Sequence, residues 1–136
     1  MSGINLSTRH LEVTVKDIDK NAFIVREDCP PRRIHALLTP KWTSMVLYVL
    51  HHATFRTGEL QRAMPGISKK MLTQTLRELE VDGLVTRDVH SSVPPVIEYS
   101  LTDLGRQIVQ PILALYDWAD ANKDLLDRIE SRCRRP

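Results

Sequence analysis

Cysteine and glycine are scarce in this chain, and long apolar runs are missing from it. Only two cysteines occur among 136 residues, which excludes a disulfide framework and is typical of a cytoplasmic protein. With only five glycines the chain has neither a phosphate-binding glycine loop nor a nucleophile elbow, so we expect no enzymatic activity. No apolar stretch approaches the ~20 residues that a membrane span needs, so we expect no membrane partner, and no signal peptide is expected at the N-terminus.

A large excess of one charge and metal-ligand spacings are also lacking. The formal net charge of +2 is too small to establish a nucleic-acid partner, so any electrostatic argument depends on where the charges lie. The cysteines and histidines show no metal-ligand spacing, and the adjacent His51 and His52 point to different sides of a helix. We therefore expect no metal and no cofactor. A length of 136 residues fits one domain with a sizeable core.

Between Gly66 and Leu84 the sequence predicts one short helix with two faces of opposite character. Leu72, Leu76 and Leu79 recur at helical spacing and are expected to pack on a core. Hydrogen-bond donors recur at the same spacing on another face: Lys70, Thr73, Gln74 and Arg77. Side chains of these types suit phosphate oxygens and the base edges of the DNA major groove. The stretch is typical of a recognition helix.

The ends of this helix are well marked, and its charges oppose its dipole. Ser68 is a good N-cap and Gly83 supplies the stop. Lys69 and Lys70 lie at the positive end of the helix dipole, where each costs about 0.3–1 kcal/mol at low salt. An anion bound at this end would turn that cost into a gain. Solvated surface is the alternative explanation for two lysines, so the neighbouring motifs must decide.

Short helices before the recognition helix complete a helix-turn-helix. The sequence predicts helices over residues 32–38, 41–52 and 57–63, with Thr57 as the cap of the third. Pro65-Gly66 then makes a tight turn into the recognition helix. Two short helices separated by such a turn form a helix-turn-helix.

After Gly83 the apolar period changes from helical to two. This change predicts strands over residues 85–89 and 97–101, joined by a polar, proline-containing loop. A two-stranded ribbon after a recognition helix is a wing that can lie along the DNA backbone or reach a minor groove. Arg87 and His90 are its candidates for phosphate contact. The alternative is a hairpin that only closes the domain.

Apolar positions near the C-terminus exceed what one buried helix face requires. Helices are expected over residues 102–119, capped by Thr102, and over residues 120–132. Apolar surface left over at a chain end usually indicates another subunit. A two-fold dimer would also place two recognition helices about one DNA turn (~34 Å) apart. We expect the dimer interface to include Leu37, Leu38, Ile108, Ile112, Leu115, Leu125, Leu126 and Ile129.

Several independent motifs stand in a specific order between residues 29 and 119. They are Cys29-Pro30, Lys41-Trp42-Thr43, Glu59-Leu60, Pro65-Gly66-Ile67-Ser68, Lys70-Met71-Leu72-Thr73, Leu76-Arg77-Glu78-Leu79, Asp82-Gly83-Leu84, Val93-Pro94-Pro95, Glu98-Tyr99-Ser100-Leu101-Thr102 and Leu104-Gly105. With this set the chain resembles the HxlR-type family, the MarR-like winged helix-turn-helix regulators of bacteria and archaea.

The resemblance implies a mainly α-helical fold with a small β-wing and with N- and C-terminal dimerisation helices. The winged helix-turn-helix domain would span residues 29–119, after an extension over residues 1–28 and before a dimerisation helix and basic tail over residues 120–136. It implies a homodimer that binds double-stranded DNA at a pseudo-palindromic operator, and we expect a repressor. The recognition positions that it implies are those that helical spacing selects: Ser68, Lys69, Lys70, Thr73, Gln74 and Arg77.

The two cysteines suggest a response to oxidants or electrophiles. Cys29 occupies the position that some family members use as a sensor, and Arg26, Arg32 and Arg33 would stabilise its thiolate. Cys133 lies in an arginine-rich tail and is a candidate reactive thiol or resolving partner. The alternative is that Cys29 is a small buried hydrophobic residue and that Cys133 is an incidental surface thiol.

Two further functions stay open at this point. A regulator that senses a small molecule would need a pocket near the dimer helices, lined by Trp42, Tyr116 and Trp118. For these aromatic residues we favour the alternative, simple core packing. A winged-helix module that binds proteins would need an apolar or acidic recognition face. The face found here carries lysine, threonine, glutamine and arginine, which favours DNA.

Overall fold

The computed structural model describes residues 19, 22 and 25–133, and the chain divides into two units after Ala36. Helix α2 (Pro30–Leu38) begins in the first unit, with two prolines in its first turn. Proline is tolerated there because the first N–H groups of a helix have no intrahelical partner. The predicted start of this helix, near Arg32, is therefore wrong: the helix begins two residues earlier, at Pro30. The expected extension over residues 1–28 lies largely outside the described residues.

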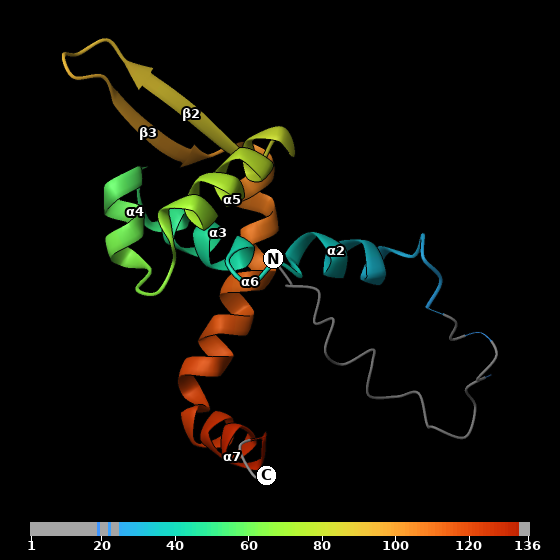
Figure 1. Ribbon diagram of the computed structural model, residues 1–136. Coiled ribbons are helices and arrows are strands. Elements are labelled where there is room, and N and C mark those ends of the chain that lie inside the picture. Colours follow the sequence, from blue (N-terminus) through green and yellow to red (C-terminus); the bar gives the residue numbers. More distant parts are fainter. Residues whose placement is uncertain (1–18, 20–21, 23–24, 134–136) are drawn as a thin grey trace, which may run out of the picture. The chain divides into compact units, whose positions relative to one another are not determined.

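The second unit contains most of the helices and a small antiparallel sheet. Its elements are α3 (Thr43–His52), β1 (Phe55–Arg56), α4 (Thr57–Ala63), α5 (Lys69–Val81), β2 (Val85–His90), β3 (Val96–Leu101), α6 (Asp103–Ala121) and α7 (Lys123–Cys133). Figure 1 shows the β2–β3 hairpin extending beyond the helices, with α7 at the opposite end of α6. The predicted winged helix-turn-helix, mainly α with a small β-wing, is confirmed.

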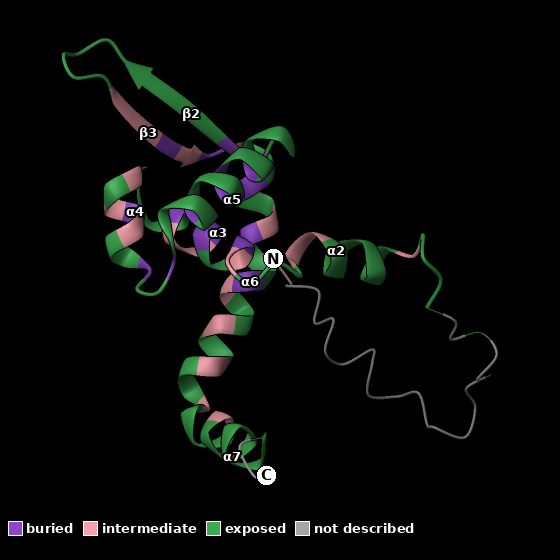
Figure 2. Ribbon diagram, in the orientation of Figure 1, coloured by how far each residue is buried: buried purple, intermediate pink, exposed green. Residues whose placement is uncertain are grey.

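The core lies where α3, α5 and the first half of α6 meet. Leu72, Leu76 and Leu79 of α5 are at most 1% exposed, and Leu47 and Val109 bring α3 and α6 to the same cluster. Figure 2 shows buried residues gathered at this junction, while the end of the hairpin and α7 are exposed. The predicted core face of α5 is confirmed. Its opposite face is thereby fixed toward solvent.

Both predicted ends of α5 are present. The Ser68 side chain is the N-cap, and its Oγ accepts a hydrogen bond from the backbone N–H of Met71 at 3.0 Å. Gly83 follows the helix with a φ of +74°, a left-handed conformation that glycine adopts without strain. Together these ends fix the length and direction of the recognition helix.

The beginning of α6 is attached to the end of the recognition segment. The Thr102 hydroxyl donates to the carbonyl of Gly83 at 2.6 Å and accepts from the N–H of Gly105 at 3.1 Å. Gly105 lies so close to the preceding segment that an added Cβ would be 2.2 Å from the carbonyl oxygen of Leu84. The predicted Thr102 cap is confirmed, and it also ties α6 to the turn after α5.

The sheet has a strand that the sequence pattern did not indicate. β1 has only two residues, too few for a detectable alternation, and Phe55 pairs with Tyr99 of β3 in a sheet of order β1–β3–β2. Because β1 runs directly into α4, the extended residue before that helix is Arg56. Thr57 is instead the first helical residue, so its predicted role as the cap is wrong. Strand β1 thus joins the base of the wing to the helix-turn-helix, because it pairs with β3 and continues into α4.

None of the helices in the described part of the chain is long and apolar enough to cross a lipid bilayer.

Candidate DNA-binding surface

Helix α5 exposes a polar surface opposite the core, which we call the recognition face. Its side chains border a shallow hollow of about 660 Å³ and come from one side of the helix: Lys69, Lys70, Thr73, Gln74 and Arg77. All are exposed, and Ser68 lies beside them at the N-cap. The structure therefore brings every sequence-predicted residue of the recognition helix to one surface.

The cationic groups of this face are available for a ligand. Among the residues that the structure describes, the side-chain nitrogens of Lys69, Lys70 and Arg77 make no ion pair or hydrogen bond. The Thr73 hydroxyl donates to the carbonyl of Lys69 at 2.8 Å, so it faces a ligand chiefly as an acceptor. The charges that oppose the helix dipole thus have no compensating partner within the described chain.

Glu78 is a residue of this surface that sequence reasoning did not select. The side-chain amide of Gln74 donates to Glu78 Oε1 at 3.1 Å, one helical turn further along. The i,i+4 spacing of glutamine and glutamate is the signal that could have identified the pair. The contact orients the Gln74 amide before any ligand is bound.

A second hollow, of about 400 Å³, lies between α5 and the wing, and we call it the wing hollow. Polar side chains from three sides line it: Thr57 of α4, Thr73, Arg77 and Glu80 of α5, and Arg87 of β2. Tyr99 of β3 forms an apolar part of its wall and is 9% exposed. Arg87 is thus placed beside the recognition helix rather than apart from it.

His90, the other wing candidate, contacts its own sheet. Its Nε2 lies 3.2 Å from Glu98 Oε2 on the neighbouring strand. Glu98 also lies 3.9 Å from Arg56 Nε, so His90 shares this carboxylate with a permanent cation. The contact makes His90 a weaker candidate for phosphate than Arg87. In the described ranges, no three His, Cys, Asp or Glu residues gather in a way that could hold a metal ion.

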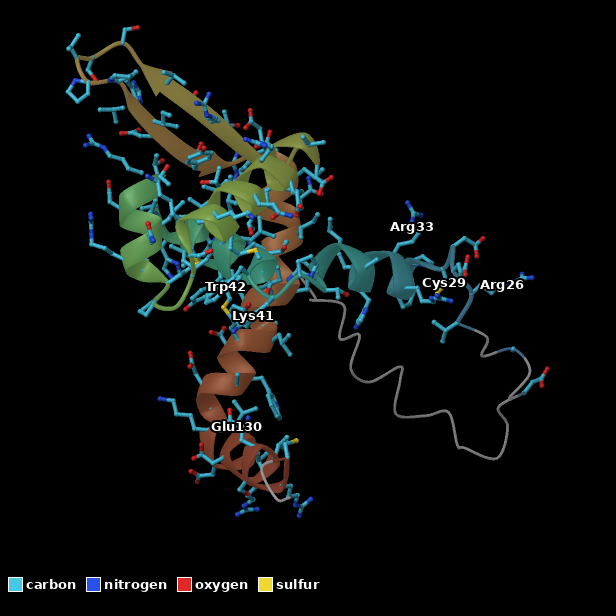
Figure 3. All side chains as sticks on the ribbon, in the orientation of Figure 1. Arg26, Cys29, Arg33, Lys41, Trp42 and Glu130 are labelled. Atoms are coloured by element: carbon cyan, nitrogen blue, oxygen red, sulfur yellow. The ribbon has the colours of Figure 1, made fainter. Side chains whose placement is uncertain are left out.

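Cys29 lies in a turn that leads into α2. Its N–H donates to the carbonyl of Arg26 at 3.2 Å, and its carbonyl accepts from the N–H of Arg33 at 3.0 Å. Figure 3 shows these residues on the same segment. Cys29 is half-buried, while Cys133 at the end of α7 is exposed. Two predicted arginine neighbours of Cys29 are therefore close to it along the backbone.

The three aromatic residues suggested for a ligand pocket have different surroundings. The Tyr116 hydroxyl donates to Ser44 Oγ at 2.7 Å, and its ring packs edge-on against Tyr48 at 4.9 Å. Trp42 is half-buried against the core, with Lys41 Nζ 4.9 Å from its ring centre (Figure 3). Trp118 is 50% exposed. Tyr116 and Trp42 are thus used for packing within their own chain.

Of the residues predicted for a dimer interface, one is buried within its own chain and the others are half-buried or exposed. Ile112 is 3% exposed and belongs to the core of its own chain, so it offers a partner little surface. Leu115 and Ile129 are 63% and 55% exposed. The rest are half-buried or exposed along the helices: Leu37, Leu38, Ile108, Leu125 and Leu126. α7 contains no buried residue, so its apolar side chains are at most partly covered within the described chain.

Comparison with known proteins decides the family. Residues 37–127, which include the whole helix-turn-helix, the wing and α6, match the family model described as HxlR-like helix-turn-helix. The chain belongs to the HxlR-like family. It is therefore a transcriptional regulator of the helix-turn-helix type, as its relatives are, and not an enzyme.

Known proteins resemble this chain in sequence, and solved structures resemble it in fold as well. The uncharacterized HTH-type transcriptional regulator YybR of Bacillus subtilis (strain 168) is 38% identical over 112 residues, covering 82% of this chain and 90% of YybR. The redox regulator HypR in its reduced form is 37% identical with a TM-score of 0.69, covering 74% of this chain and 99% of HypR. A structure described as a candidate MarR-family regulator of Porphyromonas gingivalis W83 has 37% identity and a TM-score of 0.68, over 73% and 96% of the two chains.

Proposed function

We propose that this HxlR-like protein is a sequence-specific, cytoplasmic regulator that binds a pseudo-palindromic operator as a homodimer. The observation that carries the proposal is the recognition face. One side of α5 is buried in the core, and the other exposes donors whose cationic members have no partner in the described chain. Such a helix in the major groove gains the phosphate attraction that its dipole favours and reads base edges with its neutral side chains.

Selection of bound sequences from random DNA duplexes tests this proposal. We expect the protein to enrich one inverted repeat whose half-sites are about one helical turn apart. A matched selection with the Gln74→Ala variant should lose preference at one position of each half-site. Enrichment of no sequence, or of a sequence without two-fold symmetry, would count against the proposed mode of binding.

A homodimer is supported by the exposed apolar residues of α6 and α7. Leu115 lies on α6, and Leu125 and Ile129 lie on α7, the helix that directly follows it. Apolar surface of this kind is normally covered by a partner. A second copy covers it and also supplies the second recognition helix that a palindromic operator requires.

We propose repression as the direction of control. A dimer bound at an operator that overlaps a promoter excludes RNA polymerase from the same DNA, and this needs no further contact. A reporter gene under the selected operator should therefore be less active when the protein is present. Greater activity with the protein would assign it as an activator.

Redox control through Cys29 is a second proposal, supported by its half-buried position in the turn that leads into α2 and by the redox regulator HypR among the relatives. Cysteine is a principal target of oxidants and electrophiles in proteins. Operator affinity should change after treatment with peroxide, quinone or hypochlorite, and the Cys29→Ser variant should not respond. A Cys133→Ser variant distinguishes a resolving role for the second thiol. If none of these oxidants alters the parent protein's affinity, the redox proposal is wrong.

A further inference from the structure

The wing hollow brings charged side chains of α5 and of the wing to one place, which the recognition face of α5 alone does not. Arg77 of α5 and Arg87 of β2 both line it, and within the described ranges neither guanidinium group has an ion pair or a hydrogen bond. Glu80 adds one carboxylate to the same hollow, so the three ionised groups sum to a single positive charge. Two planar sets of N–H donors with one surplus positive charge suit a singly charged anion with several oxygen atoms.

The position of the hollow identifies that anion. The major and minor grooves of a duplex are separated by a sugar-phosphate strand. If α5 lies in the major groove and the wing reaches the adjacent minor groove, the strand between the grooves must pass between α5 and the wing. The wing hollow occupies that space, because its lining comes from α5 and from both strands of the wing. A phosphodiester carries one negative charge, which matches the surplus of the site.

We propose that the wing hollow binds one phosphodiester of the DNA backbone, held jointly by Arg77 and Arg87. This inference rests on the proposed function. The helical position of Arg77 alone suggested that it contacts a base edge, whereas the wing hollow assigns it to a phosphate. Thr57 lines the same hollow from α4 and carries a hydroxyl donor. Glu80 opposes the phosphate, so it lowers affinity for every sequence alike.

A scan of neutral phosphate replacements tests the site directly. In the operator obtained by selection, each phosphate is replaced in turn by an uncharged methylphosphonate, and the dissociation constant is measured. The parent protein should lose about 10-fold to 100-fold in affinity at one phosphate of each half-site, the size expected for a charge-assisted contact. Arg77→Ala and Arg87→Ala should each weaken binding to unmodified DNA and become less sensitive to replacement of that same phosphate. Arg132→Ala, which removes the same charge from α7, should retain the parent's sensitivity.

The salt dependence of the double variant tests whether one phosphate is shared. Each neutralised phosphate contributes about 0.9 to the slope of log affinity against log salt. Since both arginines hold one phosphate, the Arg77→Ala and Arg87→Ala pair should lower the slope by about one unit rather than about two. The two changes should also cost less together than the sum of their separate costs.

Glu80→Gln should change DNA affinity in the direction opposite to the arginine variants. Removing this carboxylate should tighten binding several-fold for all sequences, without a change in base preference. The gain should shrink when the critical phosphate is replaced by methylphosphonate. A variant that only disturbed the fold would not bind more tightly.

The outcomes separate this inference from the proposed function. If the parent selects an operator but no phosphate depends on Arg87, or if the two arginines depend on different phosphates, the shared site is wrong and the regulator remains. If Arg77→Ala changes base preference and leaves the phosphate scan unaltered, Arg77 contacts a base and the inference fails. If the parent selects no DNA at all, both proposals are overturned.

Discussion

At the scale of single residues, the structure shows how a neighbour can define the role of a side chain. Gln74 is a predicted base-reading residue, and its amide donates to Glu78 at 3.1 Å. One N–H of the amide is engaged in this contact, which leaves the second N–H and the carbonyl oxygen for a ligand. A donor and an acceptor on one amide are what the N7 and N6 atoms of adenine require. We therefore propose that Glu78 is a positioning residue for Gln74.

We predict that Glu78→Ala reduces the preference for one base at the same operator position that Gln74→Ala affects. The full discrimination of a bidentate amide–base pair is about 1–3 kcal/mol, and loss of orientation should remove part of it. Selected sequences from both variants provide the measurement. The matched control is Glu80→Ala, which removes the same charge from α5 without contacting Gln74. The control should leave base preference intact. If Glu78→Ala also leaves it intact, the positioning role is refuted.

Lys69 should act on DNA in a different way. Its ammonium group lies at the first residue of α5 and has no partner in the described part of the chain, so it attracts phosphate without regard to sequence. Lys69→Ala should weaken binding to all duplexes similarly and lower the salt slope by about one unit. Titrations of specific and scrambled duplexes at several salt concentrations measure both effects. A selective loss for one sequence would show that Lys69 contacts a base.

At the scale of elements, the junction between the recognition segment and α6 keeps α5 in place. Thr102 bonds to the backbone on both sides of this junction, and Gly105 allows the close approach to Leu84. Any side chain at position 105 would have to displace backbone rather than a flexible side chain. The glycine in the Leu104-Gly105 motif therefore has a packing role.

We predict that Gly105→Ala lowers the free energy of unfolding by about 1–3 kcal/mol, the usual cost of overpacking, and lowers Tm by several degrees. Thermal unfolding followed by circular dichroism provides the measurement. Gly58→Ala in α4 is the control, because its added Cβ would lie 3.6 Å from Arg62 Nη1, an ordinary contact. That variant should be as stable as the parent or more so, since alanine favours a helix more than glycine. Equal stability of all three proteins would contradict the packing role.

Much of the element structure could be predicted because strong local signals agree with the tertiary fold. The Ser68 cap, the Gly83 stop and the spacing of three leucines on α5 all indicate the same helix. The sequence missed β1, because two residues carry no period and their pairing with β3 is not local. It also misplaced the start of α2, since Pro30 is compatible both with a break and with a first helical turn.

The candidate site was predictable in the same uneven way. Helical spacing alone brings the recognition face together, since all its members lie on one element. The wing hollow was not predictable from spacing, because Arg77 and Arg87 come from different elements and meet only through the packing of the wing on α5. The burial of Ile112 depended likewise on which side of α6 the core occupies.

At the scale of the whole molecule, the two ends of α6 have different surroundings. Its first half packs into the core through Val109 and Ile112, whereas Leu115 and Trp118 further along are 63% and 50% exposed. The following helix has no buried residue, although Leu125 and Ile129 recur on one face. This gradient is what a helix that joins a DNA-binding core to a dimer interface should show.

We predict that Leu115→Asp and Ile129→Asp each convert the dimer to a monomer, because a buried unpaired carboxylate costs several kcal/mol at an apolar interface. Sedimentation velocity measures the mass, and the monomers should bind a single half-site far more weakly than the dimer binds the operator. Val81→Asp is the control, since Val81 is 81% exposed on α5 and outside the proposed interface. Dimers of unchanged stability in both α6 and α7 variants would show that the interface lies elsewhere.

The most direct test of the central claim is the equilibrium affinity of the parent protein for its selected operator and for a scrambled duplex of the same composition. Both titrations use the same salt concentration, because the phosphate contribution varies steeply with salt. A recognition helix that reads base edges should bind the operator at least about 10³-fold more tightly than the scrambled duplex. Equal affinity for the two duplexes would mean that α5 holds only the phosphate backbone, and it would contradict the assignment of the recognition face as a reader of sequence.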